Sequence, residues 1–226
     1  IDSQVVLHHP LIELESPAGQ DDRPARPDPD FFPVPQGDDT PNLTSTAIRG
    51  LNHGDVIHSR PVVINYNRNS DDVYVFYGAN DGMFHAVKGG QASGGGVEEW
   101  AFVPPEGFGK LKRLRDHSPI ISTSDTKPYF IDGSATVYTS TTSVDTTIDY
   151  TVGDKAYLYL TARRGGRFIY ALNVSNPSAP KLLWKHTNAD TGFAELGQTG
   201  SELKVGRIRG QTEPVVSFGL GYDSDA

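Results

Sequence analysis

The sequence predicts an all-β fold, a β-propeller of four-stranded antiparallel blades, and three observations lead to this class. Gly and Pro punctuate the chain throughout, with 24 and 16 residues among 226, and no long stretch has a helical period. A series of short apolar strands, a Gly-rich turn and a closing Trp occurs twice. A shorter apolar series begins a third time near Ser201. Repetition of one four-strand unit is the sequence signature of propeller blades.

The first repeat is centred on residues 78–82, Gly-Ala-Asn-Asp-Gly, which lie between two apolar runs at 73–77 and 83–87. Asn, Asp and Gly tolerate the positive φ angles of tight hairpins, so this stretch favours a turn between two strands. A third run closes on Trp100, and residues 60–64 supply a strand ahead of the others. We therefore expect one blade over about 61–103.

The second repeat follows the same order. Apolar strands are predicted at 133–138, 156–161, 167–173 and 181–184, with the Gly-rich turn at 162–166. The blade is expected over about 134–186, with Trp184 at the position that Trp100 has in the first blade. A third unit is predicted from strands at 202–208 and 214–218.

We divide the chain into an N-terminal segment, 1–43, and a partial propeller, 44–226. Residues 1–14 contain short apolar runs that fit an edge strand, whereas 16–41 are rich in Pro and Asp and are typical of a linker. Propellers close with about four to eight blades. Two to three blades cannot close a ring, so we expect an internal piece of a longer protein whose remaining blades follow Ala226. The alternative is that these units pack as an open stack of sheets.

Two insertions interrupt the blades. Residues 110–115, Lys-Leu-Lys-Arg-Leu-Arg, can form about two helical turns with Leu111 and Leu114 on one face. We expect their cations to form a solvated face, the alternative being a docking patch for an acidic partner. Residues 139–154 read as a long loop, the kind of segment that carries recognition, and their deletion is expected to spare folding.

Composition and motifs argue against several classes of function. The net charge of −8 disfavours non-specific nucleic-acid binding, and the absence of Cys excludes disulfides and thiolate metal sites. No apolar run approaches a membrane span. Nucleophile-elbow and zinc-protease motifs are missing. His58 and His85 lie beside strands, where they could approach each other, and we expect both to be hydrogen-bonded structural residues. We predict that the protein is not an enzyme.

Several short motifs occur in the order that is found in a known family. They are Gly-Asp-Val-Ile-His-Ser-Arg-Pro-Val at 54–62, Gly-Ala-Asn-Asp-Gly-Met-Phe-His-Ala at 78–86, Trp-Ala-Phe-Val-Pro-Pro-Glu at 100–106, Asp-Gly-Ser at 132–134, Gly-Gly-Arg at 165–167 with Tyr-Ala-Leu at 170–172, and Gly-Phe-Ala-Glu-Leu-Gly-Gln-Thr at 192–199. Over about 50–223 the chain resembles the C-terminal propeller of PilC/PilY-type proteins, the tip-associated adhesins and assembly factors of type IV pili. Arg163, Arg164 and Asn173 depart from the family pattern.

This resemblance implies a modified, quinoprotein-dehydrogenase-like propeller in an exported bacterial protein at the cell surface, outer membrane and pilus tip. The implied roles are pilus extension, twitching motility and attachment to host or abiotic surfaces. The implied partners are minor pilins at the tip and a surface ligand. Some members of the family bind calcium in an Asp-rich propeller loop.

The end of the chain contains a candidate for the start of such a loop. Asp223 and Asp225 have the Asp-x-Asp spacing that turns alternate carboxylates toward one Ca²⁺ ion. An ordinary acidic turn is the alternative. No other cofactor is expected.

Two further functions stay open. The apolar-Ala-Leu strand followed by Leu-Trp also resembles quinone-dependent dehydrogenase propellers, which are enzymes. An outer-membrane assembly scaffold that binds partner strands would share the same fold.

Overall fold

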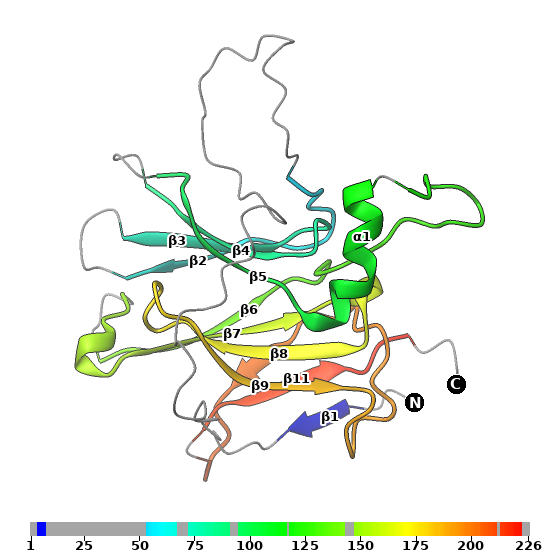
Figure 1. The fold of residues 1–226 in the computed structure, drawn as a ribbon. Coiled ribbons are helices and arrows are strands. Elements are labelled where there is room, and N and C mark those ends of the chain that lie inside the picture. Colours follow the sequence, from blue (N-terminus) through cyan, green and yellow to red (C-terminus); the bar gives the residue numbers. More distant parts are fainter. Residues whose placement is uncertain are drawn as a thin grey trace, which may run out of the picture.

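The computed structural model describes residues 4–7, 53–66, 72–90, 95–116, 118–142, 147–211 and 213–222. In these residues the strands form antiparallel sheets that lie one above another (Figure 1). The first sheet contains β2 (Val62–Asn65), β3 (Val73–Gly78), β4 (Phe84–Lys88) and β5 (Glu98–Phe102). The second contains β6 (Thr136–Ser140), β7 (Lys155–Thr161), β8 (Phe168–Asn173) and β9 (Lys181–Thr187).

Both sheets have the strand order of a meander, β2-β3-β4-β5 and β6-β7-β8-β9, which confirms the predicted four-stranded blades. The third sheet has the order β1-β11-β10, formed by β1 (Gln4–Leu7), β10 (Lys204–Gly206) and β11 (Val215–Gly219). β1 is an edge strand, as predicted, and it pairs antiparallel with β11. The rest of the 1–43 segment lies outside the described residues, so its boundary with the propeller stays a prediction.

Trp100 and Trp184 occupy equivalent positions. Each lies opposite an alanine of the preceding strand, Ala86 and Ala171 respectively, and the register shifts directly after that alanine in both sheets. In both blades the indole also contacts an aromatic ring one strand further on, in the pairs Phe76–Trp100 and Tyr159–Trp184. The ring centroids are 5.8 Å apart in each pair, and the interplanar angles are 43° and 45°. The repeat is therefore structural as well as sequential.

The second sheet is buried on both faces. Leu158, Leu160 and Tyr170 pack in one apolar cluster with residues of the first sheet. Their neighbours Tyr159 and Ile169 point the other way and pack with residues of the third sheet. Because side chains alternate along a strand, one blade contributes to both interfaces, which is how propeller blades stack.

A short helical connection follows the first blade. It consists of η1 (Pro105–Gly107) and α1 (Phe108–Asp116), with Leu111 buried and Leu114 half-buried as the sequence predicts. The expectation that the cations form a solvated face is wrong for Lys110. Its Nζ donates to the carbonyl oxygens of Tyr129 at 3.1 Å and Gly165 at 2.6 Å, and burial lowers the pKa of this amine.

Arg113 is also committed to the fold. Its guanidinium donates to the carbonyl oxygens of Pro119, Asp125 and Thr126, at 3.0, 2.8 and 2.7 Å, and so holds the loop after α1. This helix anchors the connection between blades.

Among the described residues, no helix combines the length and the apolar character that crossing a bilayer would require.

The loop between β6 and β7 is not separable from the core, contrary to the expectation for 139–154. Ile148 is fully buried and its backbone N–H donates to the Asn65 carbonyl of the first sheet at 2.9 Å. The Asp154 carboxylate is buried and accepts from Thr142 and from the Asp149 backbone N–H, ahead of η2 (Tyr150–Val152). Deleting 139–154 would therefore remove core contacts and part of β6.

The equivalence of the two tryptophans leads to a stability prediction. Trp100→Ala and Trp184→Ala should each lower the free energy of unfolding by about 2–4 kcal/mol. This is less than the loss of a fully buried aromatic side chain would cost, because both rings are half-buried. Urea denaturation of the two variants measures this. A loss below about 1 kcal/mol for one variant alone would contradict the equivalence.

The half-buried Lys110 of α1 offers a second prediction with a matched control. Lys110→Met should cost about 1–3 kcal/mol, because two carbonyl oxygens in partly buried contacts lose a charged donor. Lys112→Met should change stability by about 0.5 kcal/mol or less, since Lys112 is 78% exposed and its ion pair with Asp116, one turn away, lies at the surface. Equal effects in a thermal or urea melt would show that the Lys110 contacts contribute nothing.

Candidate functional site

The turn at 78–82 contacts the segments that form the polar sites described below. A side chain at Gly78 would place its Cβ 2.2 Å from the carbonyl oxygen of Ile131, so only glycine allows this approach. The turn thus packs directly on the segment that leads from the first blade to the second. Asp81 adds a contact to the segment before β2, because its Oδ2 accepts from the backbone N–H of Gly54 at 3.0 Å.

Asn80 joins these three segments through its buried amide. Its Oδ1 accepts from the Phe130 backbone N–H at 3.0 Å, and its Nδ2 donates to the Asp55 carbonyl and to Asp132 Oδ1, both at 3.3 Å. Asp132 in turn accepts from His58 Nδ1 at 2.7 Å. His58 is therefore a hydrogen-bonded structural residue, as predicted.

A polar cavity of about 400 Å³ opens beside this network. It is lined by residues that precede an edge strand in each of the three sheets, namely Arg60 before β2, Ser134 before β6 and Ser201 before β10. These segments are in contact, since the Arg60 backbone N–H donates to Ser134 Oγ at 3.3 Å. The cavity therefore lies where an edge of each of the three sheets comes together.

Charged side chains surround the mouth of the cavity. Arg60 is 81% exposed and lies 3.6 Å from Glu202 of the third unit. Arg163, in η3 (Arg163–Gly165), lines the cavity with φ of +49°, a strained backbone angle for a residue with a side chain. The volume is in the range of small-ligand or side-chain pockets, and the lining can bind a charged polar group.

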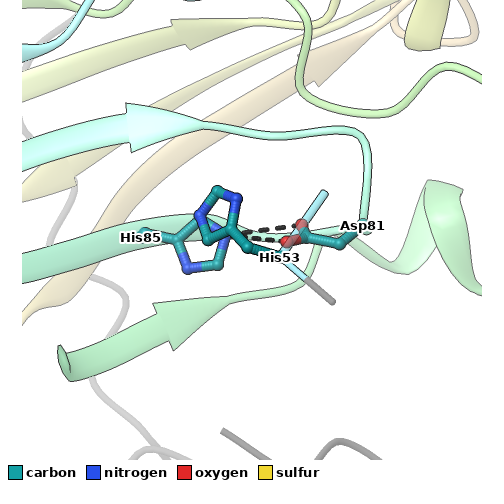
Figure 2. A group of neighbouring side chains, drawn as sticks. All are labelled: His53, Asp81 and His85. Carbon is teal, nitrogen blue, oxygen red and sulfur yellow. Dashed lines mark hydrogen bonds and ion pairs between the residues drawn. The ribbon is translucent and has the colours of Figure 1, made fainter. Parts of the chain in front are cut away.

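A second polar cluster lies on the first blade, between the segment before β2 and the β3–β4 hairpin (Figure 2). His85 of β4 is 1% exposed, and its Nε2 lies 3.1 Å from Asp81 Oδ2. Its Nδ1 lies 2.6 Å from Glu98 Oε2 of β5. The ring is enclosed by the rings of His53 and Tyr77, whose centroids are 4.8 and 5.0 Å away.

The two carboxylates determine the protonation of this imidazole. Burial opposes the charged form of His85, but hydrogen bonds and charges from Asp81 and Glu98 outweigh burial and raise its pKa to about 9. The same pairing, with backbone donors from Gly54 and Met83, lowers the pKa of Asp81 against the effect of burial. Burial, followed by the charges of Glu98 and Asp81, raises the pKa of Tyr77 to about 12.

The sequence identified only part of these sites. His85 is hydrogen-bonded as predicted, but it meets His53 rather than His58. The cluster was missed because its members are spread over β3, β4, β5 and the segment before β2. Asp223 and Asp225, the predicted calcium ligands, lie outside the described residues, and that site stays a prediction.

Comparison with known proteins identifies relatives of this chain by sequence. No protein-family model matches the chain. It is 32% identical over 200 residues to the type IV pilus biogenesis factor PilY1 of Pseudomonas aeruginosa (strain UCBPP-PA14), covering 76% of this chain and 15% of that protein. It is 34% identical over 155 residues to the PilY1 homolog of Xylella fastidiosa (strain Temecula1), covering 67% and 11%.

A solved structure, the C-terminal domain of Pseudomonas aeruginosa PilY1, matches with 26% identity and a TM-score of 0.41, over 62% of this chain and 23% of that chain. The stacked four-stranded antiparallel sheets define the chain as part of a β-propeller. The sequence matches then place it in the PilC/PilY family. The chain spans only a small part of the length of each of these relatives.

The raised pKa of His85 predicts how the stability of the metal-free protein, measured in buffer that contains EDTA, depends on pH. Protonated His85 contributes about 3 kcal/mol to folding, the equivalent of its shift from 6.5 to about 9. The contribution is complete below pH 6.5 and is lost as pH rises through about 9. Urea denaturation between pH 6 and pH 10 should show this fall, on a scale of about that size. A His85→Gln variant that shows the same fall would rule out His85 as its source.

Proposed function

We propose that the chain forms part of the propeller of a type IV pilus biogenesis factor, which promotes pilus extension and attachment without catalysing a reaction. The observation that carries this proposal is the 32% identity to PilY1 over 200 residues. The blade topology supports it, because a rigid stack of sheets presents its connecting segments as a recognition surface.

The polar cavity is the place in this chain where we propose that a partner binds. The insertions favoured by the sequence fit this role less well, since Lys110, Arg113 and Ile148 are engaged within the fold. Arg60 and Arg163 border the cavity with cationic groups, and Arg60, 3.6 Å from Glu202, would exchange this surface ion pair for a partner's anion. A carboxylate or another anionic group of a minor pilin at the pilus tip is a partner of matching charge.

The remaining parts of the proposal follow from the family. We propose that the protein is exported to the bacterial surface, that it acts as an adhesin for host or abiotic surfaces, and that Asp223 and Asp225 begin a calcium loop. Deleting the gene that encodes this chain should remove surface pili and attachment, and the gene in trans should restore both. Normal piliation after deletion would overturn the biogenesis role itself.

The cavity has its own test in the same strain. Arg60→Ala, and Arg60→Ala combined with Arg163→Gly, should reduce surface pili or attachment severalfold, because the partner loses its cationic contacts. Glycine is chosen at Arg163 since it adopts φ of +49° without strain. Sheared pili measured by immunoblot, together with surface attachment, give the readout.

Lys112→Ala is the matched control, because Lys112 is a cation of similar exposure, 78% against 81% for Arg60, on α1 outside the cavity lining. It should leave pili and attachment unchanged. Protein levels of each variant are compared in the same samples. Normal pili and attachment in the double variant would remove the cavity from the mechanism and leave the biogenesis role standing.

A further inference from the structure

The geometry points to a binding site for a divalent transition-metal ion of the zinc class, formed by His53, Asp81 and His85 on the first blade. One donor atom from each of these residues lies within 4.8 Å of the other two. Figure 2 shows the two imidazole rings stacked beside the Asp81 carboxylate. The site is separate from Asp223 and Asp225 and differs from them in chemistry, since it combines nitrogen and oxygen ligands.

Both imidazoles are held as metal ligands usually are. His53 Nδ1 lies 2.6 Å from the Gly54 carbonyl oxygen, which can only accept, so Nδ1 carries the proton and Nε2 offers a lone pair. His85 Nδ1 donates to Glu98 Oε2 at 2.6 Å. A ring N–H anchored on a carbonyl or a carboxylate fixes the tautomer and directs the other nitrogen toward a metal.

The distances require a small rearrangement. Donor atoms around a four-coordinate Zn²⁺ lie about 3–3.5 Å apart, given bonds of about 2.0–2.1 Å. His85 Nε2 and Asp81 Oδ2 already have this separation, at 3.1 Å. His53 is exposed, so its ring can close the remaining distance by exchanging its 2.9 Å contact with the Tyr77 hydroxyl for the metal.

The charge and polarity of the site select the ion. Binding would displace the proton that His85 Nε2 shares with Asp81, since a ligating nitrogen needs its lone pair. The resulting set of two neutral imidazoles and one carboxylate suits Zn²⁺ and its neighbours, whereas Ca²⁺ prefers a shell of oxygen ligands. The second carboxylate, Glu98, is 8% exposed and already supports His85 from outside the ligand set. Three protein ligands leave a fourth position for water or for a donor from a partner, next to the exposed His53.

A bound ion would join two segments of the first blade. His53 belongs to the segment before β2, which also lines the polar cavity through His58 and Arg60. Asp81 and His85 belong to the β3–β4 hairpin. The ion would therefore reinforce the contact that Asp81 makes with Gly54. This is a structural role that does not depend on the identity of the partner.

The test uses the full chain, treated with EDTA and then exchanged into metal-free buffer. Titration with Zn²⁺ against a chromophoric indicator should give one ion per chain, and Zn²⁺ should raise the melting temperature. Co²⁺ in place of Zn²⁺ should give the intense visible absorption of a four-coordinate site. Excess Ca²⁺ should displace neither ion.

Variants identify the ligands. His53→Ala and Asp81→Asn should each weaken Zn²⁺ binding about tenfold or more. His53→Ala is the decisive variant, because this side chain is exposed and its loss spares the core; circular dichroism confirms folding. His186→Gln is the matched control, a histidine of β9 that pairs with Asp190 outside the cluster, and it should bind Zn²⁺ as the unaltered chain does.

Two outcomes would overturn the proposal. One is the absence of stoichiometric Zn²⁺ binding by the folded chain. The other is binding that folded His53→Ala and Asp81→Asn both retain within twofold, which would place the ion on other residues.

Discussion

The structure depends on the close packing of the 78–82 turn against the segment that joins the first two blades. Gly78 brings the turn within contact of the Ile131 backbone, and the Asn80 amide then satisfies the polar groups of Phe130 and Asp132. A buried amide with three partners leaves little freedom for the segments it joins. Because the chain before β2 meets the same turn through Gly54, its position is also fixed there.

A turn of the second blade packs equally closely against the same connecting segment. A Cβ at Gly165 would lie 1.5 Å from the Phe130 carbonyl oxygen, so the turn after β7 also requires glycine at its contact with the connecting segment. Lys110 of α1 then donates to the Gly165 carbonyl. The connection between blades is thus enclosed by two hairpin turns and a helix, and the relative position of the sheets follows from backbone contacts as well as from the apolar core.

Both polar sites arise at the borders of this junction. The cavity forms where the segments before β2, β6 and β10 meet, and the His85 cluster forms where the segment before β2 covers the β3–β4 hairpin. Residues 53–60 therefore contribute to both, through His53 at one end and Arg60 at the other. A change in the position of this segment would affect the two sites together, so an ion bound at the proposed metal site would also influence the shape of the cavity.

The strands, the turns and the equivalence of Trp100 and Trp184 could be predicted from the sequence, because alternation, turn chemistry and repetition act over a few neighbouring residues. Tertiary structure alone decided which polar groups meet. His58 and Asp132 are separated by 74 positions along the chain, and Gly54 and Asp81 by 27. Lys110 looked like a solvated cation for the same reason, since the carbonyl groups that it contacts belong to distant loops. Such pairings depend on how sheets stack, and no local pattern of residues encodes them.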